Sequence, residues 1–143
     1  MREALDAGHR AALIGTERGH FRAGASVPAR IEWARRMVAT MAEDDALDFI
    51  YELVGTGIAT QEAVPAAFAL ASLSPEDPWR ACLLTATIGG DCDTIGAMVG
   101  AMVGSCKGAK AFPNRALTEI DRVNEDVDLS GVVRRLMAVR SSF

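Results

Sequence analysis

The residues of this chain best suited to chemistry lie in the segment Gly89-Gly90-Asp91-Cys92-Asp93-Thr94. One residue separates the two carboxylates, and the hydroxyl of Thr94 follows at once. Carboxylate and hydroxyl oxygens are hard ligands, which Mg²⁺, Mn²⁺ and Ca²⁺ prefer and Zn²⁺ does not. The spacing therefore predicts part of a metal site in which Asp91, Asp93 and Thr94 are the ligands.

The same acids have a plainer explanation at the start of a helix. Aspartate is a preferred N-cap residue, and its negative charge is favoured at the positive end of the helix dipole. A helix is expected here, because a segment of small and apolar residues runs from Ile95 to Gly104. From the residues alone, both explanations stay open for Asp91 and Asp93: metal binding and simple capping.

Glycines precede and follow the two acids. Gly89 and Gly90 allow a tight turn, and they are candidate substrate-binding residues. The expected helix carries further glycines every four residues, at positions 96, 100, 104 and 108. Each costs about 1 kcal/mol relative to alanine in a helix, so four on one face predict close approach of a neighbouring helix. This glycine helix is therefore expected to be the central one.

The elements that must position this segment are all expected to be helices, because no stretch shows the alternation of a strand. Caps, glycines and prolines predict their limits as follows: Arg2 to about Ile14, ended by Gly15; a helix capped by Ser26; Asp44 or Asp45 to Val54; Thr60 to Leu73, starting late or kinked at Pro65; a helix capped by Ser74 or Asp77; Asp91 to about Lys107; and two helices after Pro113 and Asp128.

Apolar residues at helical spacing mark the faces expected to be buried. They are Val27, Ile31, Ala34, Met37, Val38 and Met41; Leu47, Ile50, Tyr51 and Val54; Trp79, Cys82, Leu83 and Ala86; Leu117, Ile120 and Val123; and Leu129, Val132, Val133, Leu136 and Val139. The expected fold class is all-α, as a single compact helical domain over residues 1–143.

Composition excludes several classes of protein. With 143 residues, 50% of them hydrophobic and 24% charged, the chain is long and apolar enough for one globular core. A formal net charge of −4 gives no basic surface for nucleic acid. Three cysteines without paired spacing predict reduced thiols and a cytoplasmic location. The start lacks the apolar core of a signal peptide and the apolar runs are too short for a bilayer, so no membrane contact is expected.

Three other polar residues attract attention without forming a site. His9 and His20 lie outside any ligand spacing and are expected on the surface or in a loop. Two explanations stay open for Glu62. It is either an acid or a partner of the site, or it is simply a glutamate in the first turn of a helix, where the helix dipole favours its charge.

The segment Gly-Gly-Asp-x-Asp-Thr-Ile before a small-residue helix resembles the C-terminal metal motif of the ADP-ribosylglycohydrolase family. Residues 57–67, with a glutamate before Val64-Pro65-Ala66, and residues 108–113 are similar to two other segments of this family, in the same order. The resemblance covers about residues 55 to 120. Cys92 stands where the family usually has threonine, between the ligands rather than at one.

This resemblance implies an orthogonal all-helical domain that holds two Mg²⁺ or Mn²⁺ ions. It implies a hydrolase that cleaves a ribosyl glycosidic bond in ADP-ribosylated protein or in a related ADP-ribosyl compound. Asp91, Asp93 and Thr94 match the family's C-terminal ligands, and Asp93 takes the place of the ligand that bridges both ions. It does not identify the catalytic residues or the group to which the ADP-ribose is attached.

The family's other ligands, a Thr-Asp-Asp triplet and a glutamate, have no clear counterpart in this sequence. Glu43-Asp44-Asp45 comes nearest, but a cluster at a helix start explains it. The chain thus resembles only the C-terminal part of the family's domain, without its N-terminal helices. We expect a homo-oligomer, a complementing polypeptide or a longer protein of which this chain is a part to complete the site. The alternative is a non-catalytic remnant or helical interaction module in which Asp91 and Asp93 are helix caps.

Overall fold

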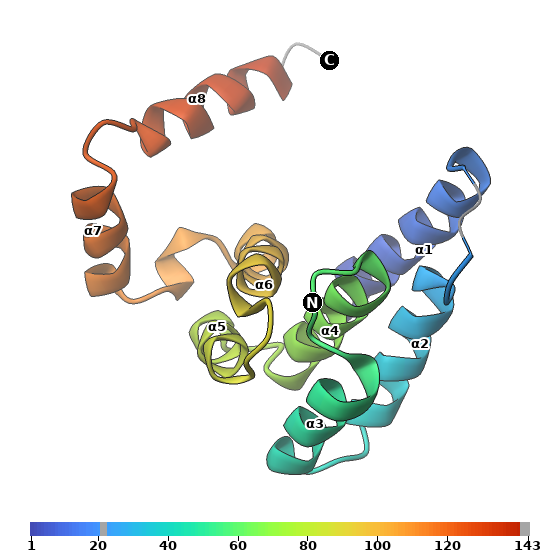
Figure 1. The fold of residues 1–143 in the computed structure, drawn as a ribbon. Helices are drawn as coiled ribbons and strands as arrows, with labels where there is room; N and C mark the ends of the chain where they lie inside the picture. Colours follow the sequence, from blue (N-terminus) through green and yellow to red (C-terminus); the bar gives the residue numbers. More distant parts are fainter. Residues whose placement is uncertain (21–22, 141–143) are drawn as a thin grey trace. The chain divides into compact units, whose positions relative to one another are not determined.

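A computed structural model of the chain describes residues 1–20 and 23–140. That part of the chain contains helices and no strand, so the all-α prediction is confirmed (Figure 1). The chain divides into two compact units, Met1–Ala111 and Phe112–Phe143, and each is described by itself. The single domain expected from the sequence stays a prediction. Within residues 1–20 and 23–140, every helix is too short or too polar to span a bilayer.

Residues 1–20 and 23–111 of the first unit form six α-helices and two shorter helical segments. The α-helices are α1 (Arg2–Arg18), α2 (Val27–Val38), α3 (Glu43–Phe49), α4 (Thr60–Leu73), α5 (Pro78–Thr87) and α6 (Cys92–Lys107). A π-helix, η1 (Ile50–Val54), continues α3, and a 3₁₀ turn, η2 (Ala109–Ala111), follows α6.

Helix α4 lies at the centre of this unit and packs against α2, α5, α6 and η1. Its alanines allow this, because small side chains on several faces let neighbouring helices approach from more than one side; Ala66, Ala69 and Leu70 are fully buried. Helix α6 buries a narrower stripe, formed by Ile95, Val99 and Val103. The prediction that the glycine helix is the central one is therefore wrong.

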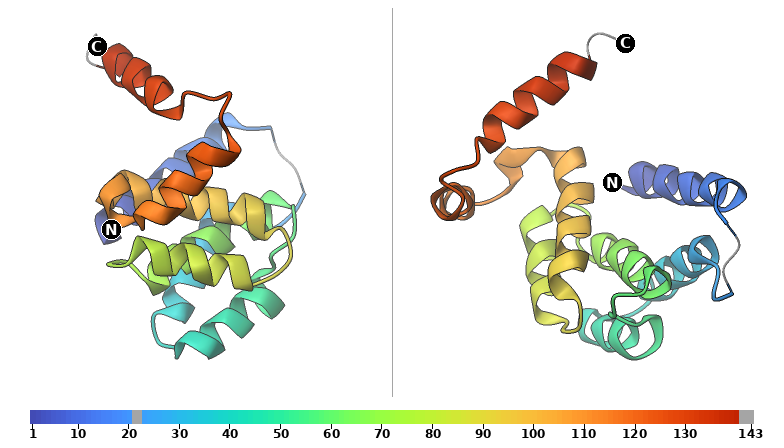
Figure 2. Two further views of the ribbon diagram at one scale, coloured as in Figure 1. Left: turned by 90° about the vertical axis from the view of Figure 1, so that its left-hand side faces the viewer. Right: turned by 45° about the horizontal axis from the view of Figure 1, so that its top comes forward.

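Helix α5 lies beside α6, to which a short turn joins it (Figure 2). It covers the glycine face as expected, but not as closely as the glycines suggest. A Cβ atom at Gly96 would lie 3.7 Å from Thr85 Cγ2, and one at Gly100 would lie 3.8 Å from Cys82 Sγ. Both distances are ordinary van der Waals contacts, so a methyl group fits at these two positions.

We therefore expect Gly100→Ala to stabilise the chain, because alanine favours the helix by up to about 1 kcal/mol and meets no steric obstacle. Urea unfolding of the two proteins, followed by circular dichroism, measures this difference. If Gly100→Ala lowers the free energy of unfolding by about 1 kcal/mol or more, the packing seen in the structure is contradicted. The interpretation that α5 packs closely enough to require glycine at position 100 would then be correct.

Several predicted helix ends are confirmed. The Ser26 hydroxyl accepts a hydrogen bond from the Ala29 N–H at 3.4 Å, and Asp77 Oδ1 accepts one from the Arg80 N–H at 2.9 Å. Both side chains cap the helices that follow them, as their residue types predict.

Other helix limits differ from the predictions. Helix α1 continues through Gly15 to Arg18, because one glycine in a helix costs only about 1 kcal/mol. Helix α3 begins at Glu43 after the N-cap residue Ala42, so neither Asp44 nor Asp45 caps it. Helix α4 does not start late, and Pro65 lies buried inside it.

The predicted buried faces hold for α2 and in part for η1, where Ile50 and Val54 are buried. Other predicted residues are exposed. Ile31, Ala34 and Val38 are buried, whereas Tyr51 is 56% exposed and Leu83 is 41% exposed. Tyr51 lies in η1, where the Gly55 N–H bonds to Ile50 O in the wider i→i+5 pattern, and this changes which residues face inward. In α5, Ala81, Leu84 and Thr85 are buried instead, while Ala86 is exposed.

The second unit contains α7 (Asn114–Val123) and α8 (Leu129–Arg140). Asp128 caps α8 as predicted, since its Oδ1 accepts a hydrogen bond from the Gly131 N–H at 2.7 Å. The apolar residues expected to face inward are largely exposed: Ile120, Val123, Leu129, Val132, Val133, Leu136 and Val139. Two short helices offer too little surface to bury two apolar stripes against each other.

Candidate metal-binding turn

The Gly89-Gly90 turn joins α5 to α6 and sets the position of the acids that follow. Gly89 has φ +81° and Gly90 has φ +69°, a backbone region that favours glycine. At Gly90 a Cβ atom would lie 2.3 Å from both the carbonyl and the hydroxyl oxygen of Thr56. The absence of a side chain there lets the turn pack directly against the loop at residues 55–57.

Asp91 is the N-cap residue of α6, but its carboxylate makes no capping hydrogen bond to the helix backbone. Instead, Oδ1 accepts a hydrogen bond from Thr94 Oγ1 at 3.0 Å. The backbone N–H of Asp91 donates to the carbonyl oxygen of Thr56 at 2.7 Å. A capping hydrogen bond therefore does not account for the acidic side chain at position 91.

Asp93 lies exposed in the first turn of α6. The Thr94 N–H lowers the pKa of its carboxyl most, and the neighbouring Asp91 side chain and the N–H of Asp93 itself lower this pKa further. The carboxylate is therefore ionised at neutral pH, as a metal ligand must be.

The donor set fits a hard cation but is incomplete. Two carboxylates and a hydroxyl lie on one turn, whereas Mg²⁺ takes six oxygen ligands in an octahedron. Within residues 1–20 and 23–140, no group of three or more His, Cys, Asp or Glu side chains is placed to hold a metal ion. The described residues therefore supply at most part of the coordination of such an ion.

The acidic triplet Glu43-Asp44-Asp45 lies in the first turn of α3 and does not complete this donor set. Glu43 forms an ion pair with Arg80 in the first turn of α5. The Gly89-Gly90 turn follows the other end of α5, which is about 15 Å long for its 10 residues. The structure thus supports the interpretation of this triplet as a helix start.

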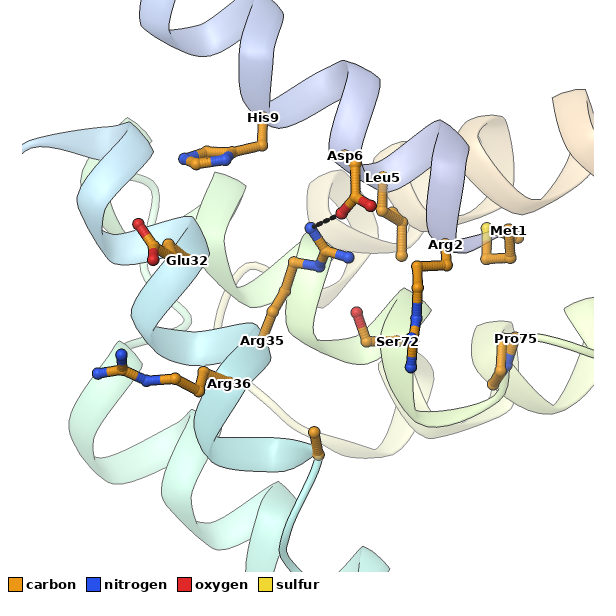
Figure 3. A pocket seen from close by; sticks show the side chains of 11 residues that line it. Met1, Arg2, Leu5, Asp6, His9, Glu32, Arg35, Arg36, Ser72 and Pro75 are labelled. Carbon is orange, nitrogen blue, oxygen red and sulfur yellow. Dashed lines mark ion pairs between the residues drawn. The ribbon is translucent and has the colours of Figure 1, made fainter.

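A cavity of about 500 Å³ lies away from the turn, near the C-terminal end of α4 (Figure 3). It is lined mainly by α1 and α2, and Arg35 pairs with Asp6 there at 2.9 Å. His9 lines this cavity, and His20 lines a second cavity of about 520 Å³. None of the five candidate site residues lines either cavity, so both histidines stay outside the candidate site.

Two residues that support the turn are hard to identify from the sequence. Nothing in the sequence marks Thr56 itself, although the pattern Gly55-Thr56-Gly57 indicates a tight loop. Thr56 is 5% exposed, and its carbonyl holds Asp91. Glu62, which the sequence left open, accepts a hydrogen bond from the Gly57 N–H at 3.0 Å through Oε2.

Comparison with known proteins identifies the family to which these features belong. Residues 1–142 match the family described as ADP-ribosylglycohydrolase, a wider match than the segments that suggested the resemblance. The uncharacterised protein YegU of Escherichia coli (strain K12) is 41% identical over 102 residues, which cover 71% of this chain and 30% of YegU. The matched part therefore spans less than a third of this curated relative. No solved structure matches the chain. The chain belongs to the ADP-ribosylglycohydrolase family.

Proposed function

We propose that this chain forms part of a metal-dependent hydrolase that cleaves a ribosyl glycosidic bond in ADP-ribosylated protein or in a related ADP-ribosyl compound. Membership of the ADP-ribosylglycohydrolase family supports the reaction class. The observation that carries the metal site is the Asp91 carboxylate, which occupies an N-cap position without capping the helix. Three free cysteines, Cys82, Cys92 and Cys106, support a cytoplasmic location.

Asp91, Asp93 and Thr94 would hold Mg²⁺ or Mn²⁺ through two carboxylates and a hydroxyl. Such ions act as Lewis acids and lower the pKa of a bound water when they are present. The residues of this chain would contribute two carboxylates and a hydroxyl at a fixed spacing, because the turn and α6 define the backbone positions of all three residues. Gly89 and Gly90 would let the substrate approach the backbone beside them.

The remaining ligands would come from another polypeptide or from a second copy of this chain. Exposed apolar side chains support such an assembly, since they include Ile58, which is 88% exposed, and residues of α8.

Titration with Mn²⁺ or Mg²⁺ tests the metal site. If the metal binds only the folded chain, a concentration tenfold above Kd raises the free energy of unfolding by about 1.4 kcal/mol. For a chain of this size the melting temperature should rise by about 4 °C. Differential scanning fluorimetry measures this shift, which we expect Asp93→Asn to abolish.

Asp48→Asn is the matched control, because Asp48 is an exposed helical aspartate on α3. It should leave the metal-induced shift unchanged. If metal shifts neither the unchanged chain nor the variants, the non-catalytic interpretation of the chain replaces the proposal. An equal loss of the shift in both variants would indicate a general effect of acidic side chains.

A further inference from the structure

We infer that Glu62 is a positioning residue, which fixes the metal-binding turn through the loop Gly55-Thr56-Gly57 rather than by touching metal or substrate. This inference deepens the proposed function and rests on it for the role of the turn. The contacts that carry it run from Glu62 to Gly57, along the loop to Thr56, and from Thr56 to Asp91.

The first step is the contact between Glu62 and the loop. Oε2 of Glu62 accepts a hydrogen bond from the Gly57 N–H at 3.0 Å. The side chain fills the concave side of the loop, because a Cβ atom at Gly57 would lie 2.5 Å from Oε2 and one at Gly55 would lie 2.8 Å from Glu62 Cγ. The loop therefore curves around this side chain, with Gly55 at φ +87°.

The second step is the other end of the loop, which Arg30 of α2 holds. Its Nη2 donates to the carbonyl oxygen of Leu53 at 3.2 Å and also to that of Val54, the last residue of η1. A guanidinium group suits the exposed carbonyls at a helix C-terminus. Arg30 thus fixes the entry to the loop, and Glu62 fixes its exit.

The third step leads from the loop to the acids. Between these two anchors, buried Thr56 accepts a hydrogen bond from the Asp91 N–H at 2.7 Å. Gly90 packs closely on Thr56, since a Cβ atom there would lie 2.3 Å from two of its oxygen atoms, so we expect the two segments to move together. A displacement of the loop therefore moves the backbone of Asp91, and with it the spacing of the Asp91, Asp93 and Thr94 side chains.

This arrangement gives Glu62 a role that its charge does not explain. A glutamate in the first turn of α4 benefits from the helix dipole, but so does Glu3 in the first turn of α1. Only Glu62 also accepts the loop N–H. A glutamine can accept the same hydrogen bond through its side-chain oxygen, so the role requires the acceptor and the shape rather than the charge.

Amide hydrogen exchange of the whole chain without metal tests the inference, with Glu62→Ala, Glu62→Gln and the control Glu3→Ala. In Glu62→Ala we expect exchange of the Gly57 and Asp91 N–H groups to be at least 10-fold faster, relative to amides of the α2 core. In Glu62→Gln and Glu3→Ala the same rates should stay within about 3-fold of the unchanged chain. Unchanged Asp91 exchange in Glu62→Ala would overturn the inference.

The affinity for Mn²⁺, measured by electron paramagnetic resonance of the free ion, separates positioning from direct participation. Loss of a supporting residue typically weakens metal binding about 10- to 100-fold, so we expect this in Glu62→Ala with recovery in Glu62→Gln. Equal losses in both variants would make Glu62 a charged participant and overturn the inference. If the unchanged chain shows no Asp93-dependent Mn²⁺ binding, the proposed function fails, and the exchange rates still decide whether Glu62 positions the turn.

Discussion

If another polypeptide supplies the remaining ligands, the purified chain with Mn²⁺ should release almost no ADP-ribose from ADP-ribosylated protein or O-acetyl-ADP-ribose. Among the described residues, the proposed site has two carboxylates and a hydroxyl, and Glu43, the nearest substitute, pairs with Arg80 at the far end of α5. Hydrolysis of this kind needs firmly held metals to position and activate water. Adding a polypeptide with the family's Thr-Asp-Asp segment should raise the rate of release by at least about 10³-fold.

Variants of the turn show whether such an activity belongs to this site. Asp91→Asn and Asp93→Asn should each remove the restored release of ADP-ribose, whereas Asp48→Asn should not. Chromatographic measurement of free ADP-ribose serves all of these mixtures. Metal-dependent release by the chain alone, at the rate of the complemented mixture, would contradict this prediction and would mean that a second copy of the chain supplies the missing ligands.

The substitution Gly90→Ala should destabilise the chain by about 3 kcal/mol or more. Its φ of +69° costs a residue with a side chain about 1 to 2 kcal/mol. The new Cβ atom would lie 2.3 Å from Thr56 O and Oγ1, so the turn must separate from the loop and lose the bond between the Asp91 N–H and Thr56. That loss adds about 1 kcal/mol or more. Urea unfolding measures the sum.

Gly89→Ala is the matched control in the same turn. Gly89 has φ +81°, but a Cβ atom there would meet only Tyr51 Cε2, at an ordinary distance of 3.6 Å. Gly89→Ala should therefore lose only the stability that a side chain at positive φ costs, without the loss caused by a steric clash. If both variants lose the same stability, the close packing between the turn and the loop contributes nothing, and the support of Asp91 by Thr56 has to be abandoned.

The sequence by itself determined the fold class, the family and the order of the helices. It did so because these depend on local patterns: apolar residues at helical spacing, caps such as Ser26 and Asp77, and a motif whose residues are contiguous. The candidate ligands Asp91, Asp93 and Thr94 needed no structure to be found, since all three lie within four residues. Local patterns gave the wrong buried face where a short irregular element changed which residues point inward, as in the π-helix that turns Tyr51 outward.

Only the tertiary structure decided which helix is central and how the acids are held. The glycines of α6 predict close packing, but how closely α5 approaches depends on side chains from another helix, such as Cys82 and Thr85. Capping and metal binding use the same residue type, and only the structure shows that the Asp91 side chain makes no capping hydrogen bond. The supporting chain from Glu62 through Thr56 to Asp91 joins residues far apart in sequence, and such contacts leave no periodic signal because they form only when the helices pack.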